Sequence, residues 1–237
     1  MNKVKKLIII PAYNEEYNIL KTVNTLKKYP DFDYVVINDG SVDNTEKILR
    51  ENDITHITLV KNLGIGGAMQ TGYKYAYNNG YDIAVQIDAD GQHNPEYLEE
   101  MTDTLIKTES DMVIGSRFIK KEGFQSSAAR RLGKNILTGI IKLFTGKKIT
   151  DPTSGFRACS AETIKLFANE YPVDYPEPET VVQILSFKGK VVEIPVIMNE
   201  RDGGVSSITP VKSMYYMIKV SIAIMFAFIN NRRRHKK

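Results

Sequence analysis

The chain has 237 residues, of which 42% are hydrophobic and 25% charged, so it can bury one sizeable core and wholesale disorder is excluded. Its net charge is +4, and residues 232–237 alone contain three arginines and two lysines. A nucleic-acid-binding protein usually spreads basic residues over a working face, so we expect no nucleic-acid partner. The single cysteine, Cys159, excludes an intramolecular disulfide and fits a reducing compartment.

The first half of the chain alternates between strand-like and helix-like segments. The four-residue apolar run before Pro11 is too short for a signal-peptide core, and the segment 5–10 is predicted to be the first strand. The spacing of apolar residues over 15–28 predicts a helix. The same patterns predict strands at 34–37, 57–60, 83–87 and 112–114, and helices at 44–51, 67–79 and 95–107. This alternation predicts an α/β fold with a mostly parallel sheet between helices.

The second half is less regular. We expect a helix at 126–144, basic at its start and apolar later, and a loop at "DPTSGFRA" (151–158). Further patterns predict helices near 161–168 and 180–187, a strand at 191–196 and a flexible loop at "NERDGGVSS" (199–207). No linker divides the sequence, so residues 1–210 are expected to form one domain, followed by a separate segment at 211–237.

Four polar or glycine-bearing clusters follow the first four predicted strands. They are "PAYNEE" (11–16), "NDGSVDNT" (38–45), "KNLGIGGA" (61–68) and "DADGQ" (88–92). Parallel sheets bind ligands at the carboxyl ends of their strands, so the clusters are expected to converge on one rim.

The two aspartates of the fourth cluster are two residues apart in an extended segment and would point the same way. Asp88 and Asp90 could share one hard divalent cation, with Gln92 as a neutral oxygen ligand, or divide ion and ribose between them. The alternative is a solvated turn, where Asp and Gly are common. His93 is expected to be an incidental loop residue, because a hard cation prefers oxygen.

The second and third clusters allow two interpretations each. Asp39 could bind a nucleotide's ribose or base, or this turn could cap the next helix through Ser41, Asp43 or Asn44. Gly64, Gly66 and Gly67 could let the backbone approach a ligand, or serve a tight turn and close helix packing. Met69 replaces the last glycine of a G-x-G-x-x-G motif, which argues against a dinucleotide-binding loop.

Several arginines are candidates for phosphate contacts, since the guanidinium fork matches phosphate oxygens. Surface arginines are usually only solvated. Arg117, after a strand end, and Arg201, in a glycine-rich loop, are stronger candidates than Arg130 and Arg131.

With these residues in view, the chain resembles the family 2 glycosyltransferases of GT-A fold, and within them the polyprenyl-phosphate branch that includes dolichyl-phosphate mannose synthases. The motifs that carry the resemblance are "IIIPAYNEE", "VINDGSVDNT", "NLGIGGAMQTGYKYA", "IDADGQHNPE", "VIGSRF", "DPTSGFRA" and "ERDGGVSS". They occur in the family's order over residues 1 to about 210. One position departs from the pattern, because Asn38 stands where the family often has the first Asp of "DDGS".

The resemblance implies inverting transfer of a sugar from a UDP- or GDP-sugar to a polyprenyl phosphate, with Mg²⁺ or Mn²⁺ as cofactor. Catalytic roles are implied for Asp90, Arg117 and Asp151, metal binding for Asp88, Asp90 and Gln92, and acceptor-phosphate contacts for Arg117, Arg131 and Arg201. The nucleotide-sugar pocket is implied to contain Pro11, Ala12, Tyr13, Glu15, Asp39, Gly66, Gly67, Asp88, Ala89 and Asp90. An anionic acceptor needs no strong base, so Asp151 would orient; with an alcohol acceptor it would be the leading base candidate. Transfer to a glycan or protein hydroxyl, and a non-catalytic nucleotide-sugar-binding subunit, are the alternatives.

The segment 214–229 is apolar apart from a few polar groups, and a membrane-spanning helix needs about 20 apolar residues. We expect a helix that lies in the membrane interface or docks on a small membrane-protein partner, with the basic end facing anionic lipid. This expectation places the protein in the cytoplasm, on the inner face of the cell membrane, with a homo-oligomer possible. The alternative is a last helix packed on the core with a solvated basic tail.

Overall fold

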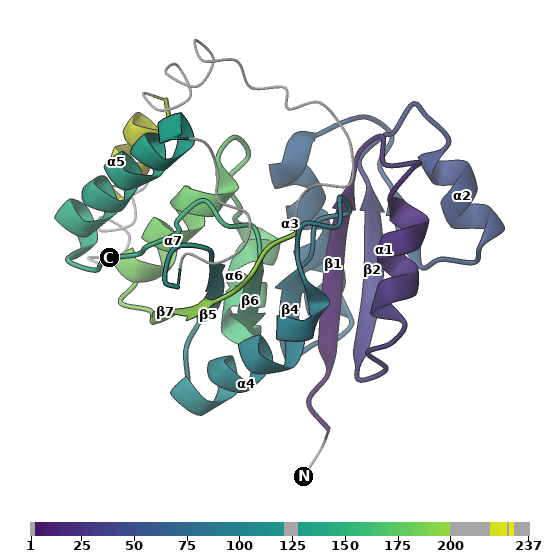
Figure 1. Ribbon diagram of the computed structural model, residues 1–237, viewed down its shortest axis with the longest axis horizontal. Coiled ribbons are helices and arrows are strands. Elements are labelled where there is room, and N and C mark those ends of the chain that lie inside the picture. The colour runs from purple at the N-terminus through teal and green to yellow at the C-terminus, as the bar shows by residue number, and fades with distance from the viewer. Residues whose placement is uncertain (1–2, 121–127, 200–218, 227, 230–237) are drawn as a thin grey trace.

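A computed structural model describes residues 3–120, 128–199, 219–226 and 228–229 of the chain (Figure 1). The strands are β1 (Lys6–Ala12), β2 (Phe32–Asn38), β3 (His56–Thr58), β4 (Ile83–Gln86), β5 (Met112–Ser116), β6 (Arg157–Ser160) and β7 (Val191–Pro195). The helices are α1 (Ile19–Leu26), α2 (Thr45–Glu51), α3 (Gly64–Asn78), the short 3₁₀ helix η1 (Pro95–Tyr97), α4 (Leu98–Thr108), α5 (Ala128–Thr145), α6 (Ala161–Asn169) and α7 (Pro176–Ser186).

All seven strands belong to one sheet, in the order β3-β2-β1-β4-β6-β5-β7. Every neighbouring pair is parallel except those that include β6, which runs antiparallel to both β4 and β5. The predicted mostly parallel α/β sheet is therefore confirmed.

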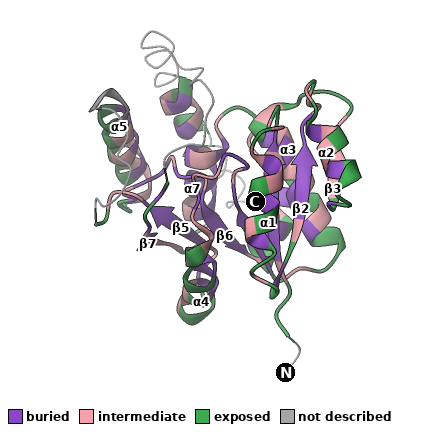
Figure 2. Cartoon of the chain, turned by 45° about the vertical axis from the view of Figure 1, so that its right-hand side comes forward, coloured by how far each residue is buried: buried purple, intermediate pink, exposed green. Residues whose placement is uncertain are grey.

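Two apolar layers cover the sheet, one on each face. One layer joins α3, α5, α6 and α7 to the side chains of one face, including Leu7 and Ile9 of β1. The other joins α1, α2 and α4 to the alternate side chains, including Ile8 and Ile10 of the same strand. Neighbouring residues of β1 thus enter different layers, as the two-residue period of a strand requires. Figure 2 shows the buried strands between helices whose outer sides are exposed.

The expectation of a loop over all of 151–158 is wrong, because Arg157–Ser160 forms β6 in the interior of the sheet. The strand is only four residues long and begins with a buried arginine, so it lacks the apolar run that predicts a buried strand. Its pairing with β4 places the "DPTSG" segment next to the end of β4, where Asp88 follows.

Other boundaries move by a few residues. The third strand ends at Thr58, and Val60, predicted to belong to it, is fully exposed. Helix α3 begins at Gly64 rather than at residue 67, and α7 begins at Pro176 rather than at 180. Proline suits this first turn, since the amide it lacks would have no partner within the helix.

Part of the C-terminal segment is described. Residues 219–226 and 228–229 are helical. Val220 and Ile224 are fully buried in the layer that contains α5, and the Phe228 ring lies 5.2 Å from that of Phe144. Within the described residues, no helix combines the length and apolarity needed to cross a membrane. The rest of the predicted segment 211–237 lies outside the described residues.

Candidate active site

The loops after β1, β2 and β3 are joined by hydrogen bonds. Asp39 N donates to Ala12 O (2.8 Å), and Asn14 N donates to Ser41 Oγ (2.9 Å). Leu63 N, at the start of α3, donates to Asp39 Oδ1 (2.7 Å). Three of the four clusters predicted to converge on one rim are therefore joined directly to one another.

Asp39 is 3% exposed and uses its carboxylate to cap α3. Burial raises the pKa of this carboxyl group, and hydrogen bonds from the Leu63 and Gly64 amides oppose part of the rise. A different aspartate serves α2: Asp43 Oδ1 accepts from Thr45 N (2.9 Å), as the capping alternative allowed. Contact of Asp39 with a ribose or base stays a prediction.

Asn38, the departure from the family pattern, is fully buried and bonded within the protein. Its Oδ1 accepts from Ser41 N (3.2 Å), and its Nδ2 donates to Thr58 Oγ1 (3.3 Å). An aspartate could accept both bonds, because the threonine hydroxyl can also donate. Either residue type therefore satisfies this position, which joins β2 to β3.

The glycines of α3 serve close packing. A Cβ added to Gly66 would lie 2.4 Å from the carbonyl oxygens of Pro172 and Val173, and one on Gly67 would lie 2.4 Å from Leu63 Cβ. Both distances are too short for a side chain. Gly66 thus lets the helix start lie directly against the segment before α7, and Gly67 leaves room for the Leu63 side chain at the start of the same helix. The packing interpretation of these glycines is therefore confirmed, whereas their contact with a nucleotide sugar stays a prediction.

Asp88 is held on three sides at the end of β4. Gln86 Nε2 donates to Asp88 Oδ1 (3.0 Å), and Asp88 N donates to His93 Nδ1 (3.0 Å). A Cβ on Gly155 would lie 2.9 Å from Gln86 Nε2 and 3.3 Å from Asp88 Oδ2. Because Gly155 has no side chain, the segment before β6 can pack closely against Asp88, whose side chain is still 35% exposed.

His93 is not incidental, contrary to expectation. It is 5% exposed, and its ring stacks on Phe156 with 5.0 Å between centroids. Because Nδ1 accepts the Asp88 amide hydrogen, the neutral ring carries its proton on Nε2, which lies 3.6 Å from Asp88 Oδ2. The histidine therefore fixes the shape of the aspartate loop. No sequence spacing marks that role.

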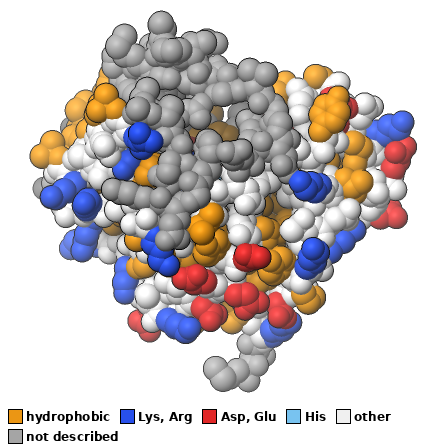
Figure 3. Space-filling view, viewed as in Figure 1, with side chains coloured by type: hydrophobic (Ala, Val, Ile, Leu, Met, Phe, Trp, Pro, Cys, Tyr) orange, Lys and Arg blue, Asp and Glu red, His pale blue; other side chains and the backbone are white. Residues whose placement is uncertain are grey.

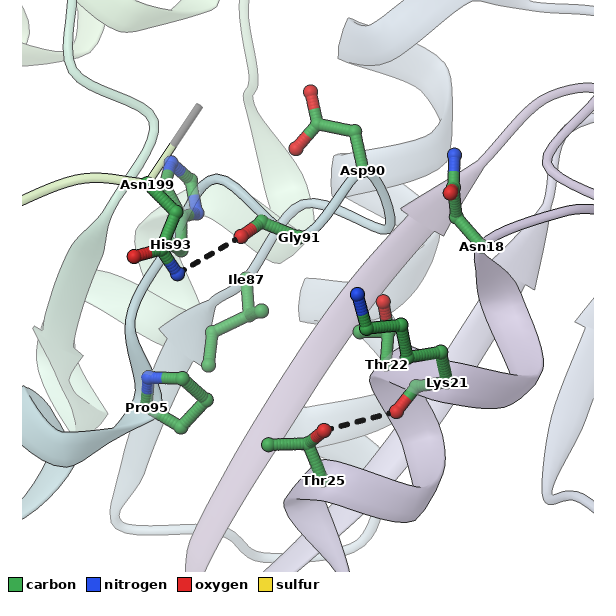
Figure 4. A pocket seen from close by; sticks show the side chains of 10 residues that line it. All are labelled: Asn18, Lys21, Thr22, Thr25, Ile87, Asp90, Gly91, His93, Pro95 and Asn199. Carbon is green, nitrogen blue, oxygen red and sulfur yellow. Dashed lines mark hydrogen bonds between the residues drawn. The ribbon is translucent and has the colours of Figure 1, made fainter. Parts of the chain in front are cut away.

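The second aspartate lies in the turn that follows. Asp90 is 8% exposed, and its Oδ1 accepts from Gln92 N (3.1 Å). The segment after β7 closes over this turn: Asn199 N donates to Gln92 O (2.9 Å), and Asn199 Nδ2 donates to Gly91 O (3.3 Å). Figure 4 shows the Asp90 carboxylate directed away from Ile87, above a cavity of about 120 Å³ between this loop and α1.

The chemistry of this loop fits a divalent cation of the Mg²⁺ or Mn²⁺ type. Asp88 and Asp90 offer carboxylate oxygens and Gln92 an amide oxygen, which are the ligands hard cations prefer. In the described part of the chain, no three His, Cys, Asp or Glu side chains gather into a metal cluster. Metal binding by these three residues stays a prediction.

A buried ion pair follows β5. Arg117 Nε donates to Asp151 Oδ2 (2.7 Å) and Nη2 donates to Oδ1 (2.8 Å), a two-pronged arrangement. The Asp151 side chain is 0% exposed and that of Arg117 19%. Burial lowers the pKa of Arg117, but the bonds to Asp151 and the nearby charge of Asp88 outweigh it, and the pKa is raised. The Arg117 guanidinium therefore stays charged near the Asp88 loop, with the Asp151 carboxylate as its counter-charge.

A basic cavity of about 560 Å³ lies beside this pair. Its lining comes from α5 and from the segments after β5 and α5: Phe118, Arg131, Lys134, Asn135, Thr138, Lys148 and Thr150. The Phe118 ring lies 5.5 Å from Arg117 Cζ and 4.3 Å from Lys134 Nζ, so it connects the pair to the cavity. Figure 3 shows Lys and Arg side chains gathered on the left, where Figure 1 places α5. The cavity suits an anion, and Arg131, predicted to bind phosphate, lines it.

The remaining predicted residues of the nucleotide-sugar pocket lie at the ends of β1 and β4. Pro11 is half-buried, and Tyr13 is 47% exposed. Glu15 N donates to Thr45 Oγ1 (2.9 Å), and Ala89 O accepts from Thr22 Oγ1 (2.8 Å). Arg201 lies outside the described residues.

We did not predict a role for Arg157 from the sequence. This residue holds in place the segment between Asp151 and β6. It is 2% exposed, and it donates to Ser154 O (2.6 Å), Pro152 O (2.9 Å) and Thr180 Oγ1 (2.6 Å). These bonds fasten the "DPTSG" segment to α7. The one sequence feature that could have indicated this role is that Arg157 lies within the "DPTSGFRA" motif.

Similar proteins indicate the family of this chain. The family described as Glycosyl transferase family 2 matches residues 7–167. A UDP-N-acetylglucosamine–dolichyl-phosphate N-acetylglucosaminyltransferase of Methanococcus voltae is 34% identical over 209 residues, which cover 80% of this chain and 83% of that protein. A polyprenol monophosphomannose synthase of Mycolicibacterium smegmatis is 29% identical over 228 residues, which cover 92% and 86%.

Among solved structures, glucosyl-3-phosphoglycerate synthase from Mycobacterium tuberculosis, in complex with Mn²⁺, UDP and glucosyl-3-phosphoglycerate, has a TM-score of 0.72 at 18% identity. The match covers 95% of this chain and 80% of that chain, and it confirms the GT-A fold. With the family match over most of the fold, the chain belongs to glycosyl transferase family 2 and is a glycosyltransferase.

Proposed function

We propose that the enzyme transfers a sugar, with inversion, from a UDP- or GDP-sugar to a polyprenyl phosphate, and that Mg²⁺ or Mn²⁺ takes part. The names of the relatives support this acceptor class, because they include transferases to dolichyl phosphate and a polyprenol monophosphomannose synthase. Since those names differ in the sugar transferred, they leave the donor of this enzyme open.

The donor would lie over the loops after β1, β2 and β4. Asp88, Asp90 and Gln92 would hold the cation, which when bound supplies positive charge to the departing diphosphate. Pro11, Tyr13 and Glu15 would line the nucleotide pocket, and Asp39, which follows β2, would lie beside it. The Gln86 and His93 contacts support the assignment, because they hold Asp88 in place.

The observation that carries the acceptor assignment is the Arg117–Asp151 pair. Both Asp151 oxygens accept from the Arg117 guanidinium, and the carboxylate is fully buried. Such a carboxylate is badly placed to remove a proton from an alcohol. A phosphate monoester is already anionic and needs a cation more than a base. The pair therefore favours a phosphate acceptor over a glycan or protein hydroxyl.

The acceptor phosphate would meet Arg117 and Arg131, with Arg201 as a third contact. Asn199, the last described residue before Arg201, supports this assignment because it is bonded to the Asp90–Gln92 turn. Asp151 would orient Arg117 and take no proton. These roles for individual side chains are part of the proposal.

We also propose that the enzyme is peripheral on the cytoplasmic face of the cell membrane. Leu132, Ile136 and Leu143 of α5 are exposed, as are Ile222 and Phe226 of the C-terminal helical residues. Lys142, Lys147 and Lys148 are exposed near the end of α5. An apolar surface bordered by lysines suits the interface of an anionic membrane, and docking on a small membrane protein is the alternative.

The proposed reaction is tested by measuring release of UDP or GDP from nucleotide sugars. A thermal-shift screen with Mn²⁺ first identifies the donor, because bound ligand stabilises the folded state. Release should then require both metal and a short-chain polyprenyl phosphate, and the matched polyprenol should not support it. Equal release with polyprenol would favour a hydroxyl acceptor. Donor binding without release for any acceptor would favour a non-catalytic subunit.

A further inference from the structure

Strand β7 places a glutamate on an otherwise apolar face of the sheet. Side chains alternate along a strand, so Val191 and Glu193 share a face. Val191 packs against the layer that contains Leu137 of α5, and Glu193 pairs with Ile114 of β5, a member of the same layer. A carboxylate on such a face requires hydrogen-bonding partners.

The partners come from the segment that carries Asp151. Thr150 N donates to Glu193 Oε2 (2.7 Å), Thr150 Oγ1 donates to Oε1 (2.9 Å), and Asp151 N donates to Oε1 (2.8 Å). All three groups are donors, and only an ionised carboxylate accepts from all of them without presenting a hydrogen of its own.

The same network reaches the other side of the ion pair. The Ser116 and Thr150 hydroxyl oxygens are 2.7 Å apart. Since the Thr150 hydroxyl donates to Glu193, the Ser116 hydroxyl donates to Thr150 Oγ1. Ser116 is fully buried and directly precedes Arg117. Glu193 is therefore linked to the backbone that carries Asp151 and to the residue before Arg117.

We propose that Glu193 is a positioning residue that sets the geometry of the Arg117–Asp151 pair toward the acceptor phosphate. The inference rests on the proposed function for its acceptor and on the hydrogen bonds of Glu193, Thr150 and Ser116 for its geometry. Glu193 does not touch substrate; it acts by holding the Thr150–Asp151 backbone at the end of the sheet. A displacement of about 1 Å in such a site is enough to change turnover about a hundredfold.

The test compares Glu193→Gln with Glu99→Gln, a matched change on the exposed side of α4. The glutamine keeps the size of the side chain but turns an NH₂ group toward a donor. We expect Glu193→Gln to raise the KM for a short-chain polyprenyl phosphate about tenfold and to leave the donor Kd with Mn²⁺ unchanged. Glu99→Gln should change neither. Combined with Asp151→Asn, the effect on KM should be smaller than the product of the single effects, because both variants act through Arg117.

Hydrogen exchange at the Thr150 and Asp151 amides gives a readout independent of activity. Both amides should exchange faster in Glu193→Gln while the amides of β1 keep their protection. If the wild type transfers sugar to no lipid phosphate, the proposed function fails. The role of Glu193 is then still decided by hydrogen exchange at the two amides and by binding of the short-chain polyprenyl phosphate. An unchanged acceptor KM in the folded variant, or an equal loss of donor affinity, overturns the proposal.

If Glu193→Gln does not fold, Thr150→Val removes only the hydroxyl link and should raise the acceptor KM by a smaller factor. An unchanged acceptor KM in Thr150→Val would overturn the proposal equally.

Discussion

The rim of this sheet has two sides that are built differently. On the proposed donor side, after β1 to β4, acidic side chains mostly accept hydrogen bonds from backbone amides, from a neighbouring loop in the case of Asp39 and Leu63 and from the same turn in the case of Asp90 and Gln92. On the proposed acceptor side, after β5, a guanidinium meets a carboxylate in a buried pair, Arg117 with Asp151. The donor side is held by many local bonds, whereas the acceptor side depends on one charge being matched by another.

The two sides should therefore respond differently to neutral substitutions. A backbone amide still finds an acceptor when an aspartate becomes an asparagine, so the donor side should keep its fold and lose its ion. Removing one member of a buried ion pair leaves the other without compensation, which is costly. On the acceptor side, function and stability should fall together.

The largest expected effect is that of Asp90→Asn on turnover. The substitution should lower kcat at least about a hundredfold, because a charge that holds the counter-ion of the diphosphate is lost. The free energy of unfolding should stay within about 0.5 kcal/mol of wild type, since the asparagine oxygen can still accept from Gln92 N. Kinetics and urea unfolding are to be compared with Asp103→Asn on exposed α4. Full activity in EDTA would contradict the metal assignment.

The next effect is on stability, in Asp151→Asn. We expect a loss of about 3–5 kcal/mol in the free energy of unfolding, because Arg117 stays largely buried without its partner. The control is again Asp103→Asn, which breaks the exposed Lys107–Asp103 pair and should cost below about 1 kcal/mol. Equal unfolding midpoints for the two variants would show that the buried pair is not what separates the two sides.

The sequence predicts the donor side better than the acceptor side for a physical reason. The strands and helices up to α4 alternate with clear periodicity, and parallel topology then brings their loops together. The acceptor side depends on contacts between distant residues, such as Glu193 with Thr150, and on β6, whose first residue is a buried arginine. Periodicity carries no information about such partners. His93 was missed for the same reason: its role depends on Phe156, which is far away in the sequence.

A smaller effect concerns the membrane. Phe226 is 55% exposed, and Phe226→Ser should weaken binding to anionic vesicles by about 1–2 kcal/mol without changing the unfolding midpoint. Val42→Ser on the donor side, where Val42 is 84% exposed, should leave vesicle binding unchanged. Flotation at two salt concentrations measures both. If the two variants lose binding equally, the membrane surface does not lie on the acceptor side.

The smallest effect is a pH dependence in α7. Burial raises the pKa of Glu179 to about 7, and the charge of Asp174 adds to the rise. The folded state thus binds the proton of the Glu179 carboxyl group more tightly than the unfolded state does. This tighter binding stabilises the protein fully below the unfolded pKa, and the stabilisation is lost as the pH rises through the folded pKa of about 7. Glu179→Gln should therefore gain stability over wild type between pH 5 and pH 8, by about 1 kcal/mol once partial exposure is considered. The free energies of unfolding of variant and wild type are to be compared by urea unfolding at both pH values. If their difference is the same at both, the predicted pH dependence is ruled out.

The division of the rim into donor and acceptor sides is tested most directly by comparing Arg117→Lys with Asp90→Asn in two measurements on each protein. The lysine keeps a charge beside Asp151 but lacks the fork that Arg117 presents. The division predicts that Arg117→Lys raises the KM for short-chain polyprenyl phosphate about tenfold or more and leaves the nucleotide-sugar Kd with Mn²⁺ within about twofold, whereas Asp90→Asn does the reverse. If Arg117→Lys weakens nucleotide-sugar binding as strongly as Asp90→Asn does, the two sides are not separate and the account is wrong.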